Sequence, residues 1–213
     1  ANFPSDPATA EIVADAVAAA AGPGSVVVGE IEAPFSRAKF ANGVTENRGG
    51  ESTLGNLVAE IQRWATEQPE SGSAQIAFMN PGGLRADLVG NLVDDDRSVT
   101  YRQAADVQPF ANTLVNMDLT GAQIETVLEQ QWQLNSAGTV PSRPFLKLGV
   151  SDGFEYTYTT SVLPTPSTED AADATYTQGE ITAMALDGMP IDDEQTYSVT
   201  VNSFLASGGD NFR

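Results

Sequence analysis

Strand-like and helix-like patterns alternate along this chain of 213 residues, and the alternation limits its folds more than any other feature. Short β-branched or alternating runs are typical of strands, whereas apolar residues spaced three and four positions apart are typical of helices. Strands are predicted over 25–33, 74–79, 99–101, 113–119, 154–160, 180–186 and 196–202. Helices are predicted over 5–21, 55–67, 102–107 and 121–133. The order predicts an α/β or α+β domain.

The first predicted helix precedes this alternation. Ser5 or Asp6 suits its N-cap, and alanines with scattered isoleucine and valine follow. The Gly-Pro-Gly segment at 22–24 is expected to end it. We therefore expect residues 1–24 to form a helical appendage in front of a single domain over 25–213.

Capping signals precede two of the later helices. Ser52 or Thr53 suits the N-cap of the helix over 55–67, and Thr120 suits that of the helix over 121–133. The side chains expected to point inward are Leu54, Leu57, Val58, Ile61 and Trp64 in the first, and Ile124, Val127, Leu128 and Trp132 in the second. Residues 164–177 form a polar excursion between two predicted strands.

The chain contains no cysteine and no histidine, which excludes several kinds of site. The composition excludes disulfides, thiolate metal sites, cysteine nucleophiles, histidine-containing triads and histidine-ligated metals. Catalysis by carboxylates alone stays open. A net charge of −19 disfavours nucleic acids and anionic lipid surfaces as partners. No run reaches the roughly 18 apolar residues of a transmembrane helix, so no membrane insertion is expected.

Four segments rich in glycine, asparagine and aromatic residues follow one another along the chain. They are RGGESTLGNL at 48–57, NPGGLR at 80–85, QPFAN at 108–112 with LTG at 119–121, and NSFLASGGD at 202–210. A single Gly-Gly turn would be weak support for any function. Four such segments in this order resemble the C-terminal domains of the 5'-nucleotidase family, and the resemblance covers about residues 25–213.

That resemblance implies a mixed sheet with helices packed on it and a nucleoside or nucleotide as ligand. It also implies a partner domain, an N-terminal metallophosphoesterase domain with two divalent metal ions, which is missing from this sequence. The helix over 1–24 resembles the linker that joins the two domains in the family. We therefore expect a fragment of a longer enzyme, with no catalytic residue, cofactor or metal site of its own and no activity on AMP. The family usually continues beyond the position of Arg213.

The resemblance also assigns substrate-binding residues. They are Arg48, Asn80, Arg85, Phe110, Asn112, Phe204 and Asp210. A guanidinium suits this role because it binds two oxygens of a phosphate or carboxylate at once. Each assignment has a structural alternative. Arg48 could be an ordinary exposed arginine, and Asn80 could cap its own turn. Arg85 could simply pair with Asp87 or another carboxylate.

The two phenylalanines separate the functional and structural interpretations most clearly. A lone phenylalanine usually belongs to a core, but Phe110 and Phe204 sit in loop-like segments beside asparagine or glycine. The matching aromatic residues of the family sandwich the nucleobase. Stacking contributes ~1–3 kcal/mol per base and tolerates any base, because every base has a π-face.

The acidic residues are interpreted in two ways. The resemblance makes Asp210 an acceptor for ribose hydroxyls, although a turn-stabilising aspartate is the alternative. Asn211 stands where the family pattern has glycine, which leaves the geometry of this loop open. The runs at 94–96 and 192–194 lack the spacing of an EF-hand and are interpreted as solvated turns.

The sequence leaves several functions open. The favoured hypothesis is the nucleotide-recognition domain of an exported phosphohydrolase, secreted or held at a bacterial cell surface. A stand-alone binding module without an enzymatic partner is the first alternative. Relatives that cleave UDP-sugars, 2',3'-cyclic nucleotides or sulfur esters provide a third, which keeps the family and changes the substrate.

Overall fold

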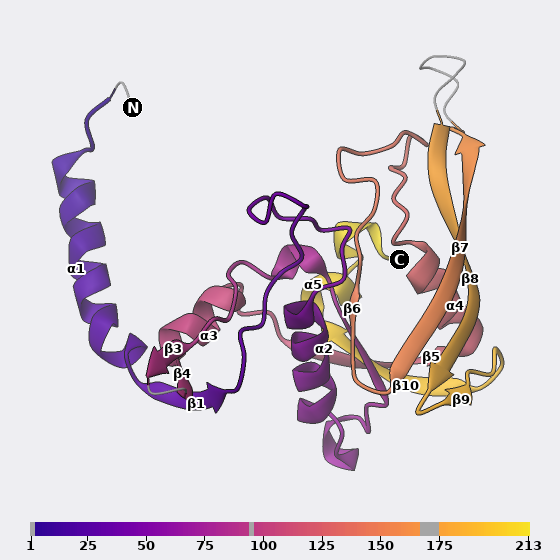
Figure 1. The fold of residues 1–213 in the computed structure, drawn as a ribbon, viewed down its shortest axis with the longest axis horizontal. Helices are drawn as coiled ribbons and strands as arrows, with labels where there is room; N and C mark the ends of the chain where they lie inside the picture. Colours follow the sequence, from indigo (N-terminus) through magenta and orange to yellow (C-terminus); the bar gives the residue numbers. More distant parts are fainter. Residues whose placement is uncertain (1–2, 94–95, 167–174) are drawn as a thin grey trace. The chain divides into compact units, whose positions relative to one another are not determined.

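The computed structural model describes residues 3–93, 96–166 and 175–213 (Figure 1). The chain divides into two compact units. Unit 1 comprises residues 1–34 and 85–109, and unit 2 comprises residues 35–84 and 110–213. Both units combine helices with strands, which confirms the predicted α+β class. The boundary expected near residue 24 between a linker helix and a single domain stays a prediction.

Unit 1 begins with α1 (Pro7–Gly24), whose N-cap is Asp6. The Asp6 carboxylate accepts a hydrogen bond from the Thr9 backbone N–H at 2.8 Å. The helix ends within the Gly-Pro-Gly segment at 22–24, as expected, although it runs to Gly24 and not to residue 21. The segment forms its last turn, and the Ser25 N–H still reaches the Ala21 carbonyl oxygen at 3.2 Å. Among the described residues, no helix is long and apolar enough to cross a bilayer.

The rest of unit 1 is a small sheet and a short helix. The sheet has the order β1-β4-β3, with every neighbour antiparallel. Its strands are β1 (Val27–Ile31), β3 (Asn91–Val93) and β4 (Asp96–Thr100), and α3 (Tyr101–Val107) follows. Thr100 and Gln103 form a capping box at the start of α3. Of the acidic run at 94–96, positions 94 and 95 lie outside the described residues.

Unit 2 contains a mixed four-stranded sheet with the order β5-β10-β2-β6. Its strands are β2 (Ile76–Met79), β5 (Leu114–Thr120), β6 (Gly149–Val150) and β10 (Thr196–Asn202). β10 pairs in parallel with β2 and antiparallel with β5, over a register from Thr196 opposite Thr120 to Asn202 opposite Leu114. All four residues of β2 are buried, as expected for an apolar strand at the centre of a sheet.

A second sheet of unit 2 is formed by β7 (Phe154–Pro164), β8 (Thr175–Leu186) and β9 (Met189–Pro190), which are antiparallel. Figure 1 shows β7 and β8 as one long twisted hairpin with α4 beside it. Both strands extend further than predicted, into the polar segment expected at 164–177. Positions 167–174 of that segment lie outside the described residues. The acidic residues 192–194 form the turn between β9 and β10.

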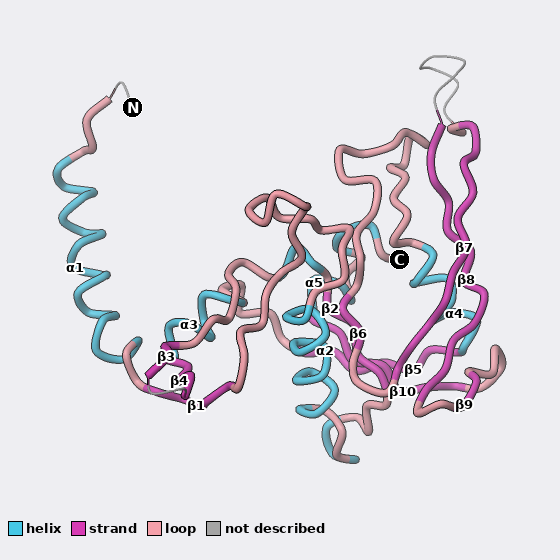
Figure 2. Tube along the Cα trace, viewed as in Figure 1, coloured by secondary structure: helices cyan, strands magenta, loops and turns pink. Residues whose placement is uncertain are grey.

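Two helices of unit 2 cover its sheets, and α5 (Ser203–Ala206) follows β10 (Figure 2). Ser52 caps α2 (Thr53–Ala65), and Thr120 with Gln123 forms a capping box on α4 (Gly121–Glu129). Ile124 and Leu128 of α4 are fully buried, as predicted. They join the core cluster with Ile76, Phe78, Leu148, Phe154, Tyr197, Val199 and Phe212.

The predicted inward face of α2 is partly wrong. Leu54 and Val58 are buried, but Ile61 and Trp64 are 50% and 65% exposed. The buried stripe runs instead through Gly55, Ala59 and Gln62. A Cβ built on Gly55 would lie 3.5 Å from the Gly149 Cα of β6, so small residues on α2 allow a close approach to the sheet. Apolar periodicity alone does not reveal a face made of small residues.

A candidate nucleoside pocket in unit 2

A pocket of about 280 Å³ lies within unit 2. It is lined by Arg48, Asn80, Gly82, Gly83, Phe110, Asn112, Phe204 and Asp210. Asn80 follows β2 and Phe204 follows β10, and these two strands run parallel. Their carboxyl ends therefore meet at one edge of the sheet, where open α/β sheets commonly bind ligands.

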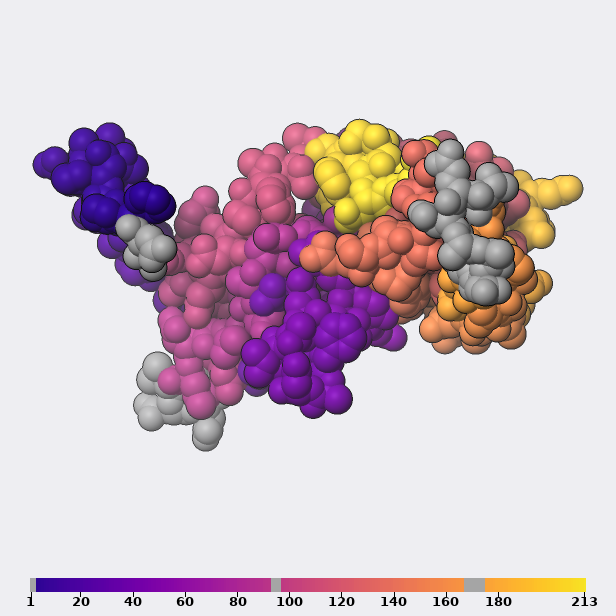
Figure 3. Space-filling view, turned by 90° about the horizontal axis from the view of Figure 1, so that it is seen from above, coloured from indigo at the N-terminus to yellow at the C-terminus, as the bar shows by residue number. Residues whose placement is uncertain are grey.

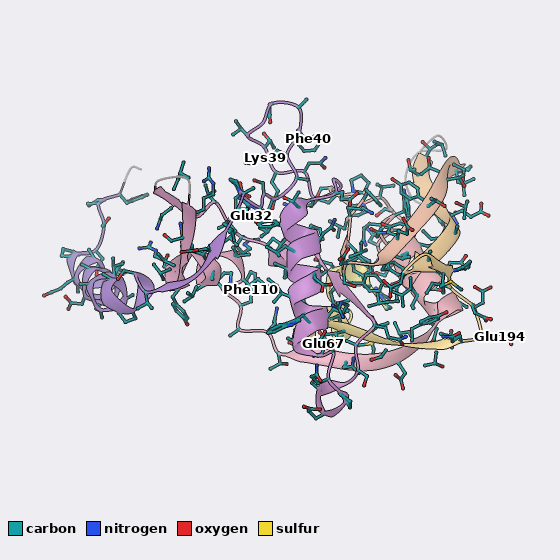
Figure 4. All side chains as sticks on the ribbon, turned by 60° about the horizontal axis from the view of Figure 1, so that its bottom comes forward. Glu32, Lys39, Phe40, Glu67, Phe110 and Glu194 are labelled. Atoms are coloured by element: carbon teal, nitrogen blue, oxygen red, sulfur yellow. The ribbon has the colours of Figure 1, made fainter. Side chains whose placement is uncertain are left out.

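Two aromatic rings contribute the apolar part of the pocket lining. Phe110 is 53% exposed and Phe204 is 43% exposed, in contrast to the buried Phe78 and Phe154 of the core. Figure 4 labels Phe110 in the loop that leads into β5. The next residue, Ala111, has a φ of +51°, a conformation that costs a non-glycine residue free energy and is often found at functional sites.

A chain of hydrogen bonds forms the polar floor of the pocket. The Asn202 amide donates to the Asn80 Oδ1 at 3.0 Å, and the Asn80 amide donates to the Asp210 Oδ2 at 2.7 Å. Asn202 and Asn80 are buried, and the Asn202 Oδ1 also caps α5 through the Leu205 N–H. We call Asn80, Asn202 and Asp210 the floor. It fixes the Asp210 carboxylate at the pocket while one of its oxygens is already satisfied.

Glycine allows close contacts at two points of the pocket. A Cβ on Gly209 would lie 2.4 Å from the Phe204 ring, so only glycine lets that ring lie on the backbone of the following loop. A Cβ on Gly82 would lie 3.1 Å from the Asp210 Oδ2 and 3.2 Å from an Arg48 guanidinium nitrogen. Gly82 therefore keeps open the space between the acidic and the basic group.

The loop that carries Asp210 adopts a left-handed backbone conformation. Asp210 and Asn211 have φ values of +52° and +64°. Aspartate and asparagine tolerate this region better than other non-glycine residues. The Asn211 amide also donates to the Leu134 carbonyl oxygen at 2.9 Å. Asn211 thus occupies, without glycine, the left-handed position at which the sequence left the loop geometry open.

Arg48 is held at the pocket by the segment before it. Its Nε donates to the Glu46 carboxylate at 3.0 Å, and its side chain is 17% exposed. Lys39 and Glu46 form a β-bridge at the base of a small hairpin, in which Phe40 follows Lys39 and donates its N–H to the Thr45 carbonyl oxygen at 2.9 Å (Figure 4). The Arg48 carbonyl oxygen accepts a hydrogen bond from the Lys147 N–H at 2.9 Å. The guanidinium is therefore oriented before any ligand arrives.

Lys147, whose N–H donates to the Arg48 carbonyl oxygen, belongs to a half-buried cluster of side chains. Its Nζ hydrogen-bonds the Tyr156 hydroxyl and lies 4.2 Å from the centre of the Tyr156 ring. Burial lowers the pKa of Lys147, opposed by the Glu51 carboxylate, and burial raises the pKa of Tyr156 to about 12. The Gln131 amide completes the cluster by donating to the Tyr156 hydroxyl at 3.0 Å.

Six of the seven predicted site residues line this one pocket, although they are spread from position 48 to position 210. Arg85 is the exception: it belongs to unit 1, where its N–H donates to the Val107 carbonyl oxygen at 2.8 Å. The pocket described here therefore does not include it. That these residues bind a nucleoside stays a prediction.

Sequence reasoning missed the role of Asn202 in the floor. It is the first residue of the NSFLASGGD segment and stands directly before a short helix. An asparagine at that place suits an N-cap, and the structure shows that it caps α5 and also holds Asn80. No pattern in the sequence indicates the second hydrogen bond, because its partners are 122 positions apart.

Sequence comparisons relate this chain to a known family. A family model described as "5'-nucleotidase, C-terminal domain" matches residues 27–213. Cell wall protein Lmo0130 of Listeria monocytogenes is 33% identical over 162 residues, which is 76% of this chain and 18% of that protein. The trifunctional nucleotide phosphoesterase protein YfkN of Bacillus subtilis is 31% identical over 164 residues, which is 76% of this chain and 10% of that protein.

Solved structures share the fold as well. The 5'-nucleotidase precursor of Thermus thermophilus has a TM-score of 0.63 and 25% identity, covering 98% of this chain and 36% of that one. The NAD nucleotidase of Haemophilus influenzae has a TM-score of 0.59 and 23% identity, covering 97% of this chain and 33% of that one. The chain thus spans only a minor part of each of these proteins.

Proposed function

Because this chain belongs to the 5'-nucleotidase family as its C-terminal domain, we propose that unit 2 holds the nucleoside of a nucleotide while a longer protein removes the phosphate. The observation that carries the proposal is one pocket in which two half-exposed phenylalanines stand with an arginine and a fixed carboxylate. Apolar walls with a few convergent polar groups are typical of small-molecule sites.

Each part of the pocket suits one part of a nucleoside. The base stacks between Phe110 and Phe204, which accounts for acceptance of different bases. The ribose hydroxyls donate to the Asp210 carboxylate, whose second oxygen is held by Asn80. The Arg48 guanidinium donates to oxygens on the sugar side of the ligand. Asn80 and Asn202 act as positioning residues, since both are buried beneath Asp210.

The division of labour in the whole protein is part of the proposal. Two divalent metal ions in an N-terminal domain activate water and stabilise the phosphoryl oxygens. This chain has no histidine or cysteine to offer such ions, and its contribution is to hold the reacting phosphate in place by grip on the distant nucleoside. We also propose export, supported by the cell-wall name of the Listeria relative and the precursor name of the Thermus structure.

Nucleoside binding to the isolated chain tests the proposal. Titration with adenosine, followed by NMR, is expected to give a Kd near the millimolar range, or ~−4 kcal/mol, because the metal domain is missing. Phe204→Ala is expected to weaken binding by ~1–3 kcal/mol. Phe40→Ala is a matched control, since Phe40 is also 53% exposed but lies in the hairpin before Arg48 and does not line the pocket.

Several outcomes would contradict the proposal. Equal loss of adenosine binding in Phe40→Ala and Phe204→Ala would indicate an effect that is not specific to the pocket. Chemical-shift changes confined to α1 would place the ligand elsewhere. Hydrolysis of AMP by the purified chain with added divalent metal would contradict the proposed division of labour. Binding without any metallophosphoesterase domain encoded upstream would favour the stand-alone module.

A further inference from the structure

A second cavity of about 450 Å³ adjoins the nucleoside pocket within unit 2. The two cavities have Arg48 and Asp210 in their lining in common. The second one continues from these residues along the loop over 134–144, where Arg143 lies, and reaches Arg213. Figure 3 shows the C-terminal residues, in yellow, against the salmon-coloured segment that precedes β6. We call this space the arginine cavity.

The charge of the arginine cavity is opposite to that of the chain. Three of its lining residues are arginines and one, Asp210, is acidic, although the chain has only 10 lysines and arginines and a net charge of −19. Three guanidinium groups around one space repel one another unless an anion lies between them. An anionic group of a ligand would relieve this repulsion.

The three arginines differ in how they are engaged. Arg48 is paired with Glu46, and an Arg213 guanidinium nitrogen donates to the Asn211 Oδ1 at 2.6 Å. Arg143 is exposed, and among residues 3–93, 96–166 and 175–213 neither a hydrogen bond nor an ion pair engages its guanidinium. Its five donors are therefore available, and this planar group matches the oxygens of a phosphate.

The wall that carries Arg143 is held by its own hydrogen bonds. The Asn135 N–H donates to the Thr139 carbonyl oxygen at 3.0 Å, and the Asn135 Oδ1 accepts from the Thr139 N–H at 3.0 Å. The Gln133 N–H donates to the Pro144 carbonyl oxygen at 2.8 Å, which closes the base of the loop. The lining also includes the hydroxyl groups of Ser136 and Ser142. This wall of the cavity is thus held in place by the protein and carries polar groups.

We propose that the arginine cavity binds a phosphate group carried on the sugar of the bound nucleoside. The proposal rests on the proposed function, which places the base between the phenylalanines and the sugar at Arg48 and Asp210. Because those two residues also border the arginine cavity, a group that enters it must be attached to the sugar and not to the base. The phosphate that is hydrolysed must face the metal ions, so this one is an additional phosphate.

Binding of four ligands to the whole chain tests the proposal: adenosine, adenosine 5'-monophosphate, adenosine 3'-monophosphate and inorganic phosphate. Adenosine 3'-monophosphate is expected to bind about tenfold more tightly than adenosine, since hydrogen bonds to charged groups contribute ~1.5–3 kcal/mol. Adenosine 5'-monophosphate is not expected to show this gain, because its phosphate is the one that faces the metal ions. Arg143→Gln is expected to remove this gain and leave adenosine binding unchanged. Arg143→Lys is expected to keep only part of it, because lysine lacks the planar fork.

Arg63→Gln is the matched control, because it removes the same charge from α2 and does not line either cavity. A gain that survives in Arg143→Gln, or that falls equally in Arg63→Gln, would overturn the proposal. Adenosine 3'-monophosphate binding no better than adenosine would overturn it too, while the proposed function would stand. If adenosine does not bind, the proposed function fails. If inorganic phosphate then changes the NMR resonances of Arg143, the cavity is a separate anion site, and the proposal of a phosphate carried on the sugar is refuted.

Discussion

The floor and the rim of the nucleoside pocket are built in opposite ways. The floor consists of Asn80, Asn202 and Asp210, joined by hydrogen bonds of 3.0 and 2.7 Å, with both asparagines buried. The rim consists of Phe110, in the loop before β5, and Phe204, which lies in the short helix α5 and not in the loop expected from the sequence; both rings are about half exposed. Polar side chains are thus inside and large aromatic ones outside, the reverse of the usual distribution.

This reversal separates what each region contributes. A buried, hydrogen-bonded amide stabilises the fold only while its partner is present, and losing the partner leaves an unsatisfied group. An exposed ring contributes little to folding, but it can bury apolar area against a ligand. The floor should therefore govern stability and geometry, and the rim should govern affinity.

Replacing phenylalanines in the core and in the rim gives the largest expected contrast. Phe78 is 1% exposed and meets the Phe154 ring edge-on at 5.6 Å. Phe78→Ala is expected to cost ~3–5 kcal/mol of unfolding free energy through lost burial and a cavity. Phe204→Ala is expected to cost less than ~1 kcal/mol. Urea unfolding of both variants measures the difference. Similar losses in the two would mean that Phe204 is a core residue.

The floor should respond next most strongly. Asn80→Ala is expected to lower the unfolding free energy by ~1–3 kcal/mol, because the buried Asn202 amide loses its acceptor. Asn112→Ala is the control, as Asn112 lines the same pocket but is exposed, and it is expected to stay within ~0.5 kcal/mol of the parent. Equal stability of the two variants would show that the floor does not hold the fold.

The sequence predicted those parts of the molecule that depend on local patterns. Strand β2, the caps Ser52 and Thr120, and the buried Ile124 follow from periodicity and capping residues close to them in the chain. The resemblance to a family, and not periodicity, selected the residues of the pocket. Asn80 and Phe204 meet because β2 and β10 end at the same sheet edge, and Phe110 and Asn112 lie there because the antiparallel strand β5 begins opposite the end of β10. No local pattern contains this arrangement, in which the hydrogen-bonded Asn80 and Asn202 are 122 positions apart.

The errors have physical causes as well. Helix α1 runs to Gly24 and not to the predicted residue 21, and it ends there because Pro23 has no N–H to donate and glycine is a poor helix former. The outward turn of Trp64 follows from the small residues Gly55 and Ala59, which bring the other side of α2 against the sheet. The arginine cavity has no sequence signature, since Arg48, Arg143 and Arg213 come from distant segments.

Changing the chemistry of the rim, and not its size alone, sharpens the comparison further. Phe204→Leu keeps an apolar side chain but loses the π-face, and we expect adenosine binding to weaken by ~1 kcal/mol with little change in stability. Phe204→Tyr keeps the ring and is expected to bind within twofold of the parent, within ~0.4 kcal/mol. Isothermal titration measures both. If Phe204→Leu binds adenosine as tightly as Phe204→Tyr, the rim acts only as a hydrophobic patch.

The smallest expected effect concerns the loop that joins rim and floor. Asn211 sits at a φ of +64° and donates to the Leu134 carbonyl oxygen at 2.9 Å. Asn211→Ala and Asn211→Gly both remove that hydrogen bond, but only alanine keeps a Cβ in the left-handed conformation, at ~1–2 kcal/mol. Glycine avoids most of this conformational cost, but it lowers the free energy of unfolding by ~0.4–1 kcal/mol because the unfolded chain becomes more flexible. The alanine variant should therefore be less stable than the glycine variant by ~0.5–1 kcal/mol in urea unfolding. Equal stabilities would mean that the backbone at Asn211 relaxes out of the left-handed region, and the position of the Asp210 carboxylate would then depend on the bound ligand as well as on the floor.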